Sequence, residues 1–290
     1  METPPAPRRA ERDVFDRLET VPRASERPWG DGTYRRRILV RRAGARAWGE
    51  LEDDFHHFRV ELRHDGSLVT DVVGSGLRSP WTTCLDAGVP LRDLVGTPLT
   101  TGPLALSHLD ARQNCTHMFD LAGLIVTHAA RGVDGDRVYD IAVDDPAVDD
   151  PAVDDPAVDG PEGGTGSRAS RLWRDGEPVL DWRLRDRTVL SPAEWVDVPL
   201  WQRFIPWAAD HLDDDLGEAA VALRRACDIA HGRQGDLDLF DRAAALPHGM
   251  DGICHSMQPS TAPVALRNIG SGRDFTDHAE LLLADFDRRT

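Results

Sequence analysis

The chain contains no lysine, so all 34 of its basic residues are arginine. Without lysine no Schiff base can form, which excludes ordinary pyridoxal-phosphate chemistry and lysine-type aldolases. The phosphate-binding loop motif that ends in lysine followed by serine or threonine is excluded for the same reason. The absence of lysine does not exclude a metal cofactor such as zinc.

Long apolar runs are also missing. No stretch of about 18 or more apolar residues occurs, so we expect no membrane-spanning helix. Residues 1–12 are polar and rich in proline and arginine, without the apolar centre of a secretory signal, and we therefore expect a cytoplasmic protein. The formal net charge of −16 disfavours nucleic-acid binding, because phosphate groups need a surplus of basic side chains.

Cysteine is scarce, with four residues in a chain of 290. In a cytosolic chain of this length, Cys84, Cys115, Cys227 and Cys254 are not expected to form a disulfide framework. Cys227 lies on the apolar face of a predicted helix and is expected in the core. Each of the other three is a core residue, a nucleophile or a metal ligand.

The periodicity of apolar residues indicates an α+β fold. Residues 1–33 are predicted to be a flexible tail with one short helix near residues 14–18, and residues 34–141 form the predicted α+β core. Apolar and charged residues alternate over residues 58–63, Asp65-Gly66 follows, and an apolar run then resumes. This pattern predicts a hairpin within an antiparallel sheet of about four strands.

Two helices are predicted to pack on this sheet. The first covers residues 85–95 and ends at Gly96. The second covers residues 116–131 and ends at Gly132, with apolar residues at helical spacing along one face. The fold class we expect is therefore an antiparallel sheet packed by two helices, followed by a mainly helical C-terminal region.

Residues 142–167 interrupt this core with an acidic repeat of the sequence AVDDP. Proline in every fifth position prevents a helix, and the charge prevents burial, so we predict a disordered insertion looped out of the sheet. Residues 168–290 are expected to supply the remaining strands and the helical C-terminal region. That region includes a helix over residues 213–230 and a final helix that begins at Asp277.

The strongest candidates for chemistry are Cys84, which ends the sequence PWTTC, and the pair Cys115 and His117. Both cysteines are predicted to precede helices, where free N–H groups and the helix dipole lower a thiol pKa. In one interpretation a thiolate is the catalytic nucleophile and His117 its acid–base partner. In another, Cys84, Cys115 and His117 bind zinc. A purely structural role, as buried cysteines and a hydrogen-bonded histidine, is the third.

A glycine-rich segment places Cys254 and His255 side by side. If the C-terminal region folds over the sheet, this pair could complete the zinc site. The alternative is an ordinary turn between helices.

Further candidates concern substrate binding. Arg267 and Arg273 flank a glycine turn of the kind that binds a carboxylate or phosphate. His128 lies on the same predicted helix face as His117. Trp201 belongs to a group of tryptophans that walls an apolar pocket, buries a dimer contact or packs in the core.

Five features follow the order of one bacterial family: an arginine-rich first strand, a hairpin, a proline-containing turn with a cysteine, a Leu-x-x-Leu-x-Gly segment and a Cys-Thr-His helix start. They occupy residues 34–40, 58–73, 80–84, 91–96 and 115–117. The chain resembles the domain-of-unknown-function family number two-eight-eight-nine over about residues 34–131. Met118 departs from the leucine expected there. The resemblance implies no activity, but it points to the same cysteine and histidine residues.

Two functional hypotheses follow. The first is a small-molecule enzyme that hydrolyses or isomerises an apolar organic acid or acyl thioester. Cys84 or Cys115 would be its thiolate, His117 its acid–base group, and Arg267 or Arg273 its anion clamp. The alternative is a non-catalytic protein, which either binds a zinc-like metal or acts as an accessory or interaction protein through its acidic insertion and its group of tryptophans. A homo-oligomer is compatible with both.

Overall fold

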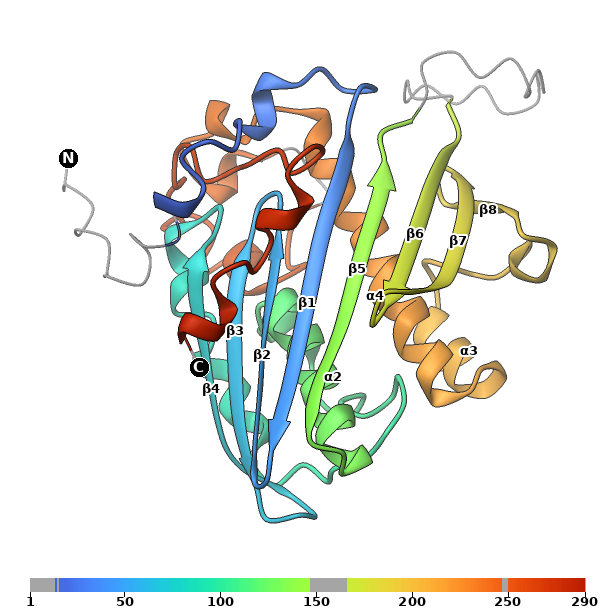
Figure 1. Ribbon diagram of the computed structural model, residues 1–290. Helices are drawn as coiled ribbons and strands as arrows, with labels where there is room; N and C mark the ends of the chain where they lie inside the picture. The colour runs from blue at the N-terminus through green and yellow to red at the C-terminus, as the bar shows by residue number, and fades with distance from the viewer. Residues whose placement is uncertain (1–13, 15, 147–165, 247–249, 290) are drawn as a thin grey trace.

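One antiparallel sheet of eight strands forms the centre of the computed structural model, which describes residues 14, 16–146, 166–246 and 250–289 (Figure 1). The strand order is β4-β3-β2-β1-β5-β6-β7-β8. The strands are β1 (Thr33–Ala43), β2 (Arg46–Asp53), β3 (His57–His64), β4 (Val69–Arg78), β5 (Gly135–Asp144), β6 (Arg168–Arg174), β7 (Glu177–Arg185) and β8 (Thr188–Ser191). The predicted four-stranded sheet is therefore half of a larger one.

Two halves of similar topology build the molecule. In the first, β1 to β4 precede helix α2 (Thr116–Arg131); in the second, β5 to β8 precede helices α3 (Phe204–His211) and α4 (Asp214–Ala230). The halves join where β1 pairs with β5, with Ile38 opposite Tyr139. Helix α2 packs on β1 to β3, and α4 packs on β5 to β7. Both helices cover the same face of the sheet (Figure 1).

Strand β1 shows how the sequence pattern creates this face. Its burial alternates, with Tyr34, Arg36, Ile38 and Val40 turned toward the helices. Arg36 is buried on this face although it belongs to the arginine-rich stretch of the strand, and it is 2% exposed. An ion pair with Asp53 on the neighbouring strand compensates the buried charge.

The ends of the two long helices follow local capping rules. Cys115 is the N-cap of α2, as predicted, and Gly132 ends the helix in the left-handed conformation with φ 71°. In α4 the side chain of Asp213 accepts a hydrogen bond from the N–H of Leu216 at 2.8 Å. Both helices were predicted correctly.

The prediction of a helix over residues 85–95 is wrong. Two short 3-10 helices, η2 (Thr82–Leu85) and η3 (Val89–Leu94), occupy this segment. Pro90 has no N–H to donate to Asp86, so a continuous α-helix cannot form. The predicted final helix is replaced by two short 3-10 helices with a turn between them, where Leu283 takes a left-handed conformation with φ 55°. The 3-10 helices are η1 (Ala24–Glu26), η2 (Thr82–Leu85), η3 (Val89–Leu94), η4 (Ala111–Gln113), η6 (Ala193–Trp195), η7 (His231–Gln234), η8 (Leu237–Leu239), η9 (Ala243–Ala245), η10 (His255–Met257), η11 (Ala279–Leu281) and η12 (Phe286–Arg289).

The opposite face of β1 to β3 is covered by the end of the chain (Figure 1). Leu283 and Phe286 pack on Trp48. Beside them, Glu50 and Glu52 are fully buried in ion pairs. The C-terminal region contains α3 and α4, but the described residues after Ala230 form only short 3-10 helices and turns, so the predicted mainly helical C-terminal region is not confirmed.

The predicted acidic insertion and the predicted N-terminal tail lie partly outside the described residues. Of the acidic insertion predicted over residues 142–167, residues 147–165 lie outside them, and residues 142–144 belong to β5. In the predicted N-terminal tail, Arg17 pairs with Glu52 at 2.7 Å, so this described part is tied to the sheet. Within the described part of the chain, no helix has the length and apolar character needed to span a membrane.

Candidate functional site

Three of the four cysteines come together at the start of α2. Cys84 lies in η2, Cys115 caps α2, and Cys254 precedes η10. The Cys84 Sγ is 3.3 Å from Ser256 Oγ, and the backbone N–H of His255 donates to the Asn114 carbonyl at 2.9 Å. The C-terminal loop is thus seated against both predicted cysteine motifs, although these motifs are far apart in sequence.

The thiols in this cluster are held in the neutral form. Burial raises the pKa of Cys84 to about 12, and burial likewise raises the pKa of Cys115 well above its ordinary value. The pKa of Cys254 is also raised by burial. The expected lowering by a helix N-terminus is therefore wrong, because desolvation of the thiolate outweighs the dipole.

His117 contacts aromatic rings and not a thiolate. Its ring stacks on that of His56 at a centroid distance of 3.8 Å and also contacts Phe58. Its Nε2 is buried without a hydrogen-bond partner among the described residues. Burial lowers the pKa of His117 well below its ordinary value, and the neighbouring His56 and Arg36 lower it further. His117 is therefore a neutral imidazole.

Asp53, at the end of β2, organises this second cluster. Its Oδ2 accepts hydrogen bonds from the Tyr34 hydroxyl and from two guanidinium nitrogens of Arg36. Its Oδ1 accepts from the backbone N–H groups of Phe55 and His56. Burial opposes ionisation, but His56 and Arg36 lower the Asp53 pKa well below its ordinary value. Asp53 is consequently an ionised carboxylate that can only accept.

This protonation state determines the tautomer of His56. The Nδ1 atom lies 3.0 Å from Oδ1 of Asp53, and an ionised carboxylate requires that Nδ1 carry the hydrogen. Burial lowers the pKa of His56, so the ring is neutral and its Nε2 carries a lone pair. One ligand atom from each of Asp53, His56 and His117 lies within 4.8 Å of the others. This arrangement is a candidate metal centre.

The sequence placed His117 in a candidate metal set, but neither His56 nor Asp53 was selected from it. A signal was present in the sequence. Asp53 stands three residues before His56 and is the last residue of β2. That spacing is typical of an aspartate whose side chain closes a turn onto the following residues.

Two predicted substrate arginines are engaged inside the protein. Arg267 donates to the Pro80 carbonyl at 2.9 Å, pairs with Asp238 and lies over the Trp81 ring. Arg273 donates to the carbonyls of residues 270 and 272. Arg267 thereby ties the C-terminal loop to the segment that precedes Cys84, and the proposed role of both arginines as anion clamps stays a prediction.

The other predicted binding residues are separate from the cysteine cluster. His128 is buried near the end of α2, with Nε2 3.1 Å from the Gly135 carbonyl. The Trp201 ring contacts the guanidinium groups of both Arg187 and Arg224. Neither residue lines the cavity that lies between α2 and α4.

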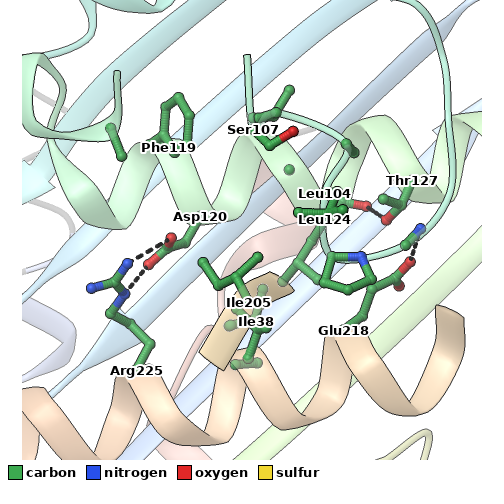
Figure 2. A pocket seen from close by; sticks show the side chains of 18 of the residues that line it. Ile38, Leu104, Ser107, Phe119, Asp120, Leu124, Thr127, Ile205, Glu218 and Arg225 are labelled. Atoms are coloured by element: carbon green, nitrogen blue, oxygen red, sulfur yellow. Dashed lines mark hydrogen bonds and ion pairs between the residues drawn. The ribbon is translucent and has the colours of Figure 1, made fainter. Parts of the chain in front are cut away.

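A cavity of about 310 Å³ lies between α2 and α4, where the two halves of the sheet meet (Figure 2). Ile38 and Leu51 form its floor on β1 and β2. Its walls are mainly apolar and come from both helices, from the start of α3 and from the loop over residues 102–111; they include Leu104, Leu106, Phe119, Leu124, Ile205 and Val221.

The charged side chains of the cavity come from three elements, and Ser107 of the loop and Thr127 of α2 add hydroxyl groups. Arg36 of β1 links it to the Asp53 cluster. Asp120 of α2 pairs with Arg225 of α4 at 2.7 Å. Glu218 also lies on α4, about two helical turns before Arg225 (Figure 2). Sequence reasoning missed this wall, although its α4 residues recur at helical spacing: Glu218, Val221, Ala222 and Arg225.

The comparisons with known proteins do not assign the chain to a family. No family model matches it, and no characterised protein is similar enough to be matched.

Proposed function

We propose that this protein binds a small, mostly apolar molecule in the cavity between α2 and α4. The observation that carries the proposal is the cavity itself, which is apolar over most of its wall and holds a few buried polar groups. Such a combination is typical of small-molecule sites. Its volume of about 310 Å³ exceeds that of an engineered apolar cavity of about 150 Å³ that binds benzene.

Gly123 of α2 offers a direct test, because it lines the cavity and its added Cβ would meet only Leu106, at 3.7 Å. We expect Gly123→Leu to fill the cavity and to lower the affinity for 1-octanol at least about ten-fold, measured by isothermal titration calorimetry. Gly123→Ala is the matched control, because one methyl group fits and the helix gains propensity. Equal binding by wild type and Gly123→Leu would place the ligand elsewhere.

A second candidate function is the binding of a divalent transition metal such as zinc, and Asp53, His56 and His117 favour it. His56 donates through Nδ1 to a carboxylate, which is the usual support for a metal-binding histidine. Both rings are neutral, as ligation requires. The positive charge of Arg36 on Asp53 opposes a cation, and one of the stacked rings must turn before both can bind the same ion.

Elemental analysis separates this metal set from the cysteine set. If the histidine set binds, purified wild-type protein contains about one zinc per chain, His117→Leu loses it, and Cys84→Ser retains it. Loss in Cys84→Ser with retention in a His56→Leu variant would instead favour the cysteine-based site. A metal-free wild type, purified without chelator and then equilibrated with zinc, would exclude both.

A further inference from the structure

Glu218 carries one oxygen whose hydrogen-bonding capacity is not used within the protein. Its side chain is 2% exposed and lines the cavity. Oε1 accepts hydrogen bonds from the Gly102 N–H at 3.1 Å and from Arg131 at 2.8 Å. Oε2 is buried and has no partner among the described residues. A buried carboxyl oxygen of this kind is costly unless something donates to it or accepts from it.

The charges around the cavity are already matched within the protein. Four charged side chains line it among the described residues, and the two arginines each have an acidic partner. Arg36 pairs with Asp53, and Arg225 pairs with Asp120. Glu218 pairs with Arg131, which does not itself line the cavity. A bound carboxylate would therefore find no free cation, and a bound ammonium would find no uncompensated anion.

An uncharged hydroxyl group meets neither obstacle. It can donate to Oε2 when Glu218 is ionised, and it can accept from the carboxylic acid when Glu218 is protonated. Burial raises the pKa of Glu218 despite the hydrogen bond from Arg131, so a partner that suits both forms has an advantage over one that suits only one.

We propose that the cavity selects an uncharged molecule with an apolar body and a hydroxyl group, and that Oε2 of Glu218 is the hydrogen-bond partner of that hydroxyl. This inference rests on the proposed binding function and names the chemical class of its ligand. It differs from the organic acid expected from the sequence, because the arginines available to hold a carboxylate in the cavity are already paired.

A matched series of eight-carbon probes tests the selection in the full chain at neutral pH. The probes are 1-octanol, octanoate, octylammonium and 1-chlorooctane, with binding measured by calorimetry. We expect 1-octanol to bind at least about ten-fold more tightly than either charged probe, because a charged head group would be buried unpaired. Equal or tighter binding of octanoate or octylammonium would overturn the inference while leaving the binding function intact.

Two substitutions connect the selectivity to Glu218. In Glu218→Leu the preference for 1-octanol over 1-chlorooctane is expected to fall about ten-fold, since the hydroxyl loses its partner. Glu218→Gln keeps a polar group that can reach the hydroxyl, and we expect it to retain the preference. An unchanged preference in Glu218→Leu would refute the role of Glu218. If no probe binds the wild type, the binding function itself fails, and the inference fails with it. If Glu218→Leu does not fold, the wild type still tests the inference, because equal binding of 1-octanol and 1-chlorooctane would show that the cavity offers the hydroxyl no hydrogen-bond partner.

Discussion

Individual buried charges are the most informative residues of this protein. Asp53 is surrounded by donors and stays ionised, whereas its neighbour Asp54 behaves in the opposite way. Burial raises the pKa of Asp54 to about 7, and the nearby Asp53 and Asp274 add to this effect, although Arg233 lowers it. Two adjacent aspartates thus differ because one has an excess of donors and the other shares a single arginine with Asp145 and Asp274.

The raised pKa of Asp54 gives a prediction with a definite sign. The folded state binds a proton at Asp54 between about pH 4 and pH 7, where the unfolded state has lost it, so this group stabilises less as the pH rises through that window. Relative to Asp54→Asn, the wild-type free energy of unfolding should fall by up to about 1.4 kcal/mol per pH unit there. Urea unfolding of both proteins from pH 4 to pH 8 measures the difference. A constant difference across the window would show that Asp54 titrates normally.

Burial also controls the ionisation of the individual thiols. Cys84, Cys115 and Cys254 gather in one place, as the sequence suggested, but desolvation keeps them protonated. Thiol catalysis therefore needs an activating group close to one of these sulfurs. The observed partner of Cys84 is a serine hydroxyl, and His117 is stacked on His56.

At the scale of elements, the segment of η2 and η3 is attached to β4 by close backbone contact. A Cβ added at Gly88 would lie 2.3 Å from the carbonyl oxygen of Gly74. The same segment carries Cys84, so this contact positions the cysteine against the start of α2. A close approach of two backbones is the physical reason for glycine at both positions.

Gly88→Ala is therefore expected to destabilise the protein by about 1–3 kcal/mol, because the added methyl overlaps main-chain atoms that cannot move aside. Gly235→Ala serves as the control, since nothing lies within 4 Å of its added Cβ. Thermal and urea unfolding of the two variants measure the effect. Similar stabilities of the two variants would mean that the η2–η3 segment can shift away from β4 without loss.

At the scale of the whole molecule, the chain end closes one face of the sheet. Glu50 is fully buried beneath it, and Arg289, Arg59 and His57 contact its carboxylate. Burial alone would raise the pKa of Glu50, but hydrogen bonds and charges from His57 and Arg289 lower it to about 2. The last residues therefore neutralise a charge that the first half of the sheet buries.

Arg289 and its neighbour Arg288 form a matched pair for a test of this closure. Arg289→Ala removes a partner of buried Glu50 and should lower the free energy of unfolding by about 3 kcal/mol. Arg288 is exposed, so Arg288→Ala should change it by less than about 0.5 kcal/mol. Urea unfolding at pH 7 compares them. Equal values for both variants would show that the chain end does not contribute to stability through this ion pair.

Local patterns in the sequence determined the elements. Alternation over residues 58–63 and the apolar run after Asp65-Gly66 predicted β3 and β4, and helical spacing of apolar residues predicted α2 and α4. These signals succeed because strand and helix periods and caps depend on neighbours within a few residues. The same local reasoning failed over residues 85–95, where Pro90 and the contact with Gly74 prevail over an apolar pattern.

The sites were decided by the tertiary structure. Asp53 and His56 are near each other in sequence, but only the packing of α2 on the sheet adds His117 to them. Glu218 and Asp120 become parts of one cavity only because two halves of the sheet join at β1 and β5 and place their helices on one face. Residue type and spacing determine what each element can be, whereas burial and long-range pairing determine which groups are charged, which are neutral and which face the cavity.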